Sequence, residues 1–194
     1  MRVPSAVPGL VAACLVLPIC SASAGAVLTP LNPPGCKSAP GNAAATREDH
    51  SEVIYYCAGV NGWRIRKTAF GTYVHAVFTP PSANKPALTL SAPYDIGPRI
   101  EWHMSGQGTP FAAVVRLHTR LESGKTASAL AVLALSSRSA CVAAIVDGAA
   151  ADANGQAHKA ASGLANGAAC PSIPTIIGPQ TEVARELSDR NKVN

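Results

Sequence analysis

Short segments in which apolar and polar residues alternate dominate the middle of the chain. Residues 63–67 alternate cleanly, which predicts a strand with Trp63 and Ile65 on a buried face and two arginines on the other face. Residues 127–135 and 141–146 are apolar on both faces, a pattern typical of central strands that are covered on two sides. Runs rich in β-branched and aromatic residues predict further strands at 53–57, 72–78, 87–90, 100–104 and 110–119.

The period of the apolar residues changes near the C-terminus. Alanines recur at spacings of three and four residues, which predicts a helix that starts at Asp152 or Asn154. A second, short and exposed helix is expected at 182–190, within a frayed tail at 171–194. Strands followed by a helix favour a single α+β domain at 52–170, built as an antiparallel sheet of about six strands with one C-terminal helix packed on a face.

Two segments lack apolar periodicity. Residues 25–51 contain several prolines and glycines and are expected to form a flexible linker. Residues 79–99 contain five prolines, and the short strand at 87–90 is the one element expected there. Because so long a connection is uncommon in a compact domain, we expect a functional loop or a lid over one sheet edge.

The N-terminus has the pattern of an export signal. A basic residue at position 2 precedes an apolar stretch that is too short for a spanning helix, and Ala22 and Ala24 supply the small residues that signal peptidase accepts. We expect cleavage after Ala24 and a periplasmic or secreted protein with no transmembrane segment in its mature chain. The alternative is a lipoprotein that is acylated at Cys14.

Composition narrows the class of protein. The hydrophobic fraction of 47% includes 36 alanines, and aromatic residues make up 5%, so valine, leucine and isoleucine must supply most of the core. These values exclude a collagen-like or wholly disordered chain. The charged fraction of 14% and the modest net charge of +5 argue against nucleic acid as a partner.

Four cysteines remain after removal of the signal segment, and they allow three pairings. Disulfides are the default in an oxidising compartment. We favour Cys36–Cys57 and Cys141–Cys170, because each pair joins a loop or a terminus to a neighbouring strand. No C-x-x-C spacing supports a zinc knuckle or a redox pair, and no cofactor motif is found, so we expect neither a metal nor a cofactor.

Acid–base chemistry has a small set of candidates. His75, His103 and His118 lie on separate predicted strands and could converge on one face, and Glu101 shares a face with His103 by the period of two. A small hydrolase that uses Glu101, His103 or His118 is therefore the alternative function. The simpler interpretation is that these histidines are solvated residues of a half-exposed sheet. Asp147 is interpreted as the first residue of a turn.

Basic residues are the candidates for binding. Alternation places Arg64 with Arg66, and Arg116 with Arg120, opposite the apolar faces of their strands. If the two strands expose the same side, they form a basic surface suited to an anionic envelope component or another protein; otherwise they are solvated outer faces. A non-enzymatic, exported binding module of unknown ligand is the function that we expect, and an enzyme is the less favoured class.

Several short stretches resemble a family of small exported alphaproteobacterial proteins of unknown function. The matching residues are Glu101 and Trp102, residues 110–112, Val115 and Arg116, residues 141–147, Ala153, Asn154, Ala157, Ala160, Cys170 and residues 56–59. Family members often carry a histidine and a tyrosine where this chain has Val142 and Ile145. The resemblance is strongest over residues 100–170 and implies export but no activity.

Overall fold

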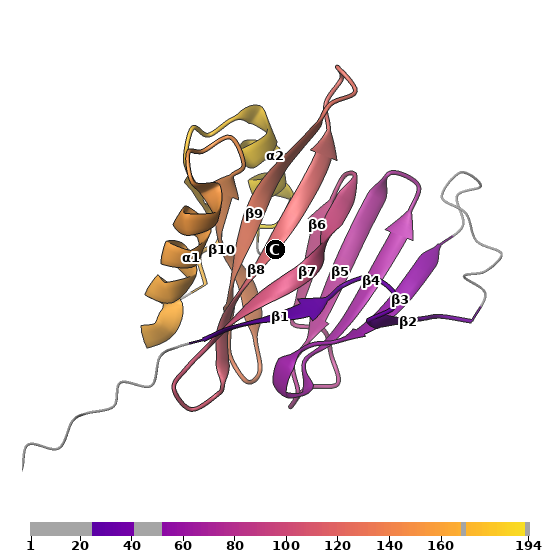
Figure 1. Ribbon diagram of the computed structural model, residues 1–194, viewed down its shortest axis with the longest axis vertical. Helices are drawn as coiled ribbons and strands as arrows, with labels where there is room; N and C mark the ends of the chain where they lie inside the picture. Colours follow the sequence, from indigo (N-terminus) through magenta and orange to yellow (C-terminus); the bar gives the residue numbers. More distant parts are fainter. Residues whose placement is uncertain (1–24, 41–51, 168–169, 193–194) are drawn as a thin grey trace, which may run out of the picture.

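The computed structural model describes residues 25–40, 52–167 and 170–192, which form two β-sheets and two α-helices (Figure 1). The helices are α1 (Ala153–Gly163) and α2 (Glu182–Arg190), with 3-10 turns at Val60–Gly62 and Leu164–Asn166. The strands are β1 (Ala26–Pro30), β2 (Cys36–Ser38), β3 (Val53–Ala58), β4 (Arg64–Phe70), β5 (Tyr73–Thr79), β6 (Leu88–Ala92), β7 (Asp95–Met104), β8 (Pro110–Arg120), β9 (Thr126–Leu135), β10 (Ala140–Asp147) and β11 (Thr175–Ile177).

The α+β class is confirmed, but the expectation of one antiparallel sheet of about six strands with one helix is wrong. Sheet A has six strands in the order β1-β7-β8-β9-β10-β11, and it is mixed because β11 runs parallel to β10. Sheet B has five antiparallel strands in the order β2-β3-β4-β5-β6. Alternation shows which face of a strand is buried, but it does not show which strands become neighbours.

The largest buried side chains lie between the two sheets. Trp102 of β7 is fully buried, and its ring centroid lies 6.0 Å from that of Trp63 and 6.4 Å from that of Phe78. A side chain at Gly59 would collide with the Trp102 ring, because an added Cβ would lie 2.7 Å from it. The prediction that Trp63 lies on a buried face is confirmed.

The opposite face of sheet A is buried under α1, so that α1 and sheet B lie on opposite sides of sheet A (Figure 1). This second core is built mainly from small and β-branched side chains: Ala112, Val114, Leu130, Val132, Ala144, Val146, Ala157 and Ala161. The helix begins as expected, because the Asp152 carboxylate accepts a hydrogen bond from the Gly155 amide at 3.1 Å. The prediction of strands that are covered on two sides is confirmed for β9 and β10.

One buried cation joins the two sheets. Lys67 of β4 is 4% exposed, and its Nζ atom donates to the Asn32 side chain and to the Ile96 carbonyl, both at 2.9 Å. The same nitrogen lies 3.2 Å from the Asp95 carboxylate. A buried ammonium group is tolerated only when such partners replace its water, so these contacts set the position of β4 against the start of β7.

The segment expected to be a linker contributes two edge strands. β1 pairs with β7 in sheet A, and β2 pairs with β3 in sheet B. These strands are only five and three residues long, and their structure comes from pairing with longer partners and not from a pattern of their own. Residues 41–51 of the expected linker lie outside the described residues, as does the expected signal segment at 1–24.

Residues 79–99 and the expected tail at 171–194 are also more ordered than expected. Residues 79–99 hold β6 and the start of β7, so they do not form a long lid. The expected tail at 171–194 contains β11 and α2, and α2 is not exposed, because Val183 and Leu187 enter the core between the sheets. At the end of α2, the Asn191 amide accepts from the Ser91 backbone nitrogen at 2.7 Å and donates to the Ser91 carbonyl at 3.0 Å.

Both favoured disulfides are present. Cys36–Cys57 joins β2 to β3, and Cys141–Cys170 joins β10 to the segment that follows α1. In the chain-entropy description, each bond stabilises the protein by about 3 kcal/mol through restriction of the unfolded chain.

Replacement of Leu187 tests whether α2 belongs to the core. Leu187→Ala should lower the free energy of unfolding by about 2–5 kcal/mol, because it leaves a cavity around a fully buried side chain. Arg185→Ala, an exposed position on the same helix, should change it by less than about 0.5 kcal/mol. Urea denaturation followed by circular dichroism measures both variants, and equal stabilities would mean that α2 is a detachable tail.

Candidate functional site

The four arginines singled out for binding lie on two different sheets. Arg64 and Arg66 project from β4 away from the core between the sheets, so they lie on the outer face of sheet B. Arg116 and Arg120 belong to β8, on the face of sheet A that carries α1. Sheet A separates the two pairs, so the four side chains do not form one basic surface.

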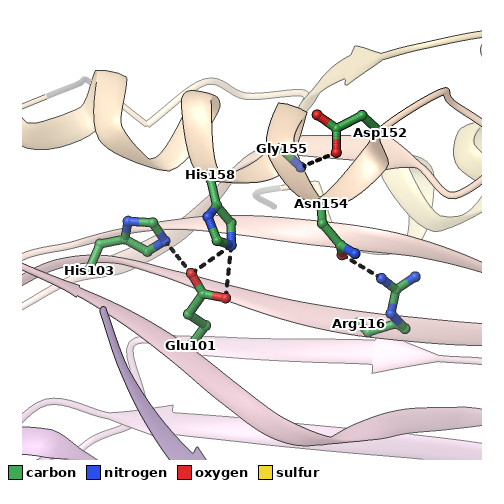
Figure 2. A network of polar contacts seen from close by, with 7 residues as sticks. All are labelled: Glu101, His103, Arg116, Asp152, Asn154, Gly155 and His158. Carbon is green, nitrogen blue, oxygen red and sulfur yellow. Dashed lines mark hydrogen bonds and ion pairs between the residues drawn. The ribbon is translucent and has the colours of Figure 1, made fainter. Parts of the chain in front are cut away.

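Arg116 and Arg120 are engaged within the protein. The Arg116 guanidinium donates to the Ser128 hydroxyl at 3.0 Å and to the Asn154 side chain at 2.8 Å, and thereby ties the start of α1 to sheet A (Figure 2). The Arg120 guanidinium lies 5.9 Å from the centre of the Tyr94 ring. These contacts give both residues a structural role.

The outer face of sheet B carries an open hollow of about 870 Å³. This volume lies in the range of sites that hold small molecules. The hollow is lined by residues from β2 to β5 and from the loop before β6: Gly35, Lys37, Tyr56, Cys57, Ala58, Gly59, Gly62, Trp63, Arg64, Ile65, Arg66, Val77, Thr79, Asn84 and Pro86.

The hollow is positively charged. Lys37, Arg64 and Arg66 line it, and no Asp or Glu is among the described residues that do so. Arg64 donates to the Ala83 carbonyl at 2.6 Å and so holds the loop that forms one wall. Lys37 and Arg66 make no ion pair with any residue in the described part of the chain, which leaves their charges available to an anion.

A second cluster lies between β7 and α1, where Glu101 sits between two imidazole rings (Figure 2). His158 Nε2 donates to Glu101 Oε2 at 3.0 Å. His103 Nε2 lies 3.0 Å from Glu101 Oε1, but neither atom makes a well-directed hydrogen bond. Glu101 and His103 thus come together as the hydrolase hypothesis requires, and His158 joins them although it was not among the residues predicted from the sequence.

The other two histidines lie apart from this cluster. His118 pairs across the strands with Asp95, and His75 Nδ1 lies 2.8 Å from the Ser91 hydroxyl on sheet B. His75, His103 and His118 therefore do not converge on one site, which the alternative hydrolase hypothesis had allowed. Among the described residues, no three His, Cys, Asp or Glu side chains are arranged to hold a metal ion.

Glu101 also borders a small cavity of about 260 Å³. Arg99, Arg116 and Asn154 line the cavity with it, whereas His103 and His158 do not. No Ser, Thr or Cys lies among its described lining residues, so a reaction here would require Glu101 to activate a water molecule.

Asp147 has the structural role expected of it. Its carboxylate is 1% exposed and accepts hydrogen bonds from the Ala149 amide at 2.9 Å and the Thr181 amide at 2.7 Å. Burial opposes ionisation, but these hydrogen bonds prevail and hold the pKa of Asp147 below its ordinary value. The residue joins the turn after β10 to the N-terminal cap of α2.

The chain matches no protein-family model, no curated protein and no solved structure. The resemblance to exported alphaproteobacterial proteins therefore stays a prediction. No helix in the described ranges is long and apolar enough to cross a membrane.

Acid should destabilise the protein through two histidines. Burial lowers the pKa of His103, although the neighbouring Glu101 carboxylate acts to raise it. Burial also lowers the pKa of His118, although the Asp95 carboxylate acts to raise it. The unfolded chain therefore takes up these protons at higher pH than the folded chain, so stability is lost as the pH falls below about 6.5.

Urea denaturation at pH 7.5 and pH 5.5 measures this loss. His103→Gln should show a smaller loss of unfolding free energy between the two pH values than the wild type. Lys159→Ala, an exposed change beside His158 on α1, should lose as much as the wild type. If His103→Gln and the wild type lose equal amounts, protonation of His103 does not contribute.

Proposed function

We propose that this protein is an exported binding module that holds an anionic ligand in the hollow on the outer face of sheet B. The observation that carries the proposal is the group of three cations, Lys37, Arg64 and Arg66, in one concave surface with no acidic side chain among its described lining residues. Charges on the wall of a hollow concentrate their field and attract ions of opposite sign.

Export is the second part of the proposal. It is supported by the apolar N-terminal pattern that ends at Ala24 and by two disulfides, which persist in oxidising compartments. A periplasmic or secreted location would bring the hollow into contact with anionic material of the cell envelope. Of the four arginines expected to bind, the proposal keeps Arg64 and Arg66 and assigns Arg116 and Arg120 to structure.

Binding to dextran sulfate, with neutral dextran as the uncharged reference, tests the proposal. The wild type should bind dextran sulfate but not neutral dextran. Binding should weaken as salt screens the charges, because the Debye length is about 8 Å at physiological ionic strength. Lys37→Ala/Arg66→Ala should weaken binding about tenfold at low salt. Arg64 is left intact because it also holds the loop at Ala83.

The matched control removes two positive charges elsewhere. Arg120→Ala/Lys125→Ala changes exposed residues at the β8–β9 hairpin and should bind like the wild type. The proposal fails if the two double variants bind equally well, or if the wild type does not bind dextran sulfate at low salt.

A second candidate function, hydrolysis, is supported by the contacts of Glu101. His158 donates a hydrogen bond to its carboxylate, His103 lies 3.0 Å from it, and the carboxylate borders the 260 Å³ cavity together with Arg116. In this role Glu101 would take a proton from water, while the hydrogen bond from His158 holds the carboxylate in place.

Hydrolysis of 4-nitrophenyl esters and phosphates tests this second function. Glu101→Gln should lower any activity at least about 100-fold, because it removes the base, whereas Lys159→Ala should retain it. Rates equal to buffer for the wild type, or equal rates for the wild type and Glu101→Gln, would exclude hydrolysis of these substrates by Glu101.

A further inference from the structure

We infer that the ligand of the hollow on sheet B is an acidic polysaccharide whose sugar rings stack on Tyr56 and whose carboxylates pair with Lys37 and Arg66. This inference rests on the proposed function, because it names the ligand class of the same site. Three features of the hollow support it: the order of side chains across the strands, the exposure of one aromatic ring and the lack of apolar anchors for a lipid.

The first feature is a row of three side chains that crosses the strands. Lys37 of β2 is the register partner of Tyr56 of β3, and Tyr56 is the partner of Arg66 of β4. Register partners on adjacent strands project from the same face, and strands lie about 4.8 Å apart. Lys37 and Arg66 therefore stand about 10 Å apart with an aromatic ring between them.

The second feature is the exposed ring itself. Tyr56 is 51% exposed although it lies in the middle of a strand. The small residues Ala58, Gly59 and Gly62 also line the hollow and leave space for a ligand beside the ring. The face of an aromatic ring carries partial negative charge and accepts polarised C–H groups, such as those on one face of a sugar ring. A ligand that matches the row therefore needs a flat C–H face between two anionic groups, as a chain of uronic acids provides.

The third feature, the lack of apolar anchors, favours a polysaccharide over a membrane surface as the ligand. A lipid surface would require apolar side chains that enter the acyl region near the cations. Tyr56 is the one large exposed apolar side chain of the described residues that lines the hollow. Phe70 and Tyr73 lie at the β4–β5 turn outside the hollow, four residues along β4 from Arg66, a distance of about 13 Å.

Binding to two polyanions separates the contribution of the sugar rings from the contribution of the negative charge. Polygalacturonate and poly-L-glutamate both carry one carboxylate per unit, but only the first offers sugar rings. We expect the wild type to bind polygalacturonate about tenfold more tightly than poly-L-glutamate of equal charge at the same salt concentration, as expected for one stacking contact. Tyr56→Ala should remove this preference and keep the weaker, charge-dependent binding.

Phe70→Ala is the matched control, because Phe70 is also 51% exposed on sheet B but lies outside the hollow, and it should keep the preference. The inference is overturned if poly-L-glutamate, or anionic lipid vesicles of phosphatidylglycerol, bind as tightly as polygalacturonate, or if Tyr56→Ala binds like the wild type. If Lys37→Ala/Arg66→Ala still weakens binding, those outcomes overturn only the choice of a polysaccharide as ligand. If that variant binds as tightly as the wild type, the proposed function fails as well.

Discussion

Burial of both faces of sheet A is the constraint on which the rest of the structure depends. Strands β8, β9 and β10 carry apolar side chains on both faces, so a single covering layer would leave hundreds of Å² of apolar surface in water. Sheet B and α2 cover one face, and α1 covers the other. The alanines on β8, β10 and α1 make the second layer possible, because small side chains let the helix lie close to the strands.

This arrangement decides where polar chemistry can occur. Under α1, polar side chains are found at the margins of the apolar contact, where Arg116 meets Asn154 and Glu101 meets His158, and both pairs hold the helix to the sheet. Sheet B has no helix on its outer face in the described part of the chain, so the cations of β2 and β4 stay accessible. The layer order thus explains why Arg116 and Asn154 serve to hold α1 on sheet A, whereas Lys37 and Arg66 on the outer face of sheet B stay exposed.

Local signals predicted much of this fold from the sequence. Alternation identified the outward arginines of β4, small-residue spacing located α1 with its Asp152 cap, and the placement of the four cysteines beside neighbouring strands predicted their pairing. Strand pairing was not predictable, because the order of the strands depends on contacts between distant segments. His158 had a usable signal, since it follows Asn154 by four residues and both must lie on one helix face. The Cys36–Cys57 pair likewise implies that the next residue, Lys37, lies opposite Tyr56 in an antiparallel pair.

We propose that the ligand meets the outer face of sheet B and not the face that carries α1. Backbone amide chemical shifts of ¹⁵N-labelled protein, followed by NMR during titration with polygalacturonate, test it most directly. We expect the shifted amides to cluster at β2, β3 and β4, around Lys37, Tyr56 and Arg66. Shifts that cluster instead around Glu101, Arg116 and His158 would contradict it, because the ligand would then occupy the face of sheet A.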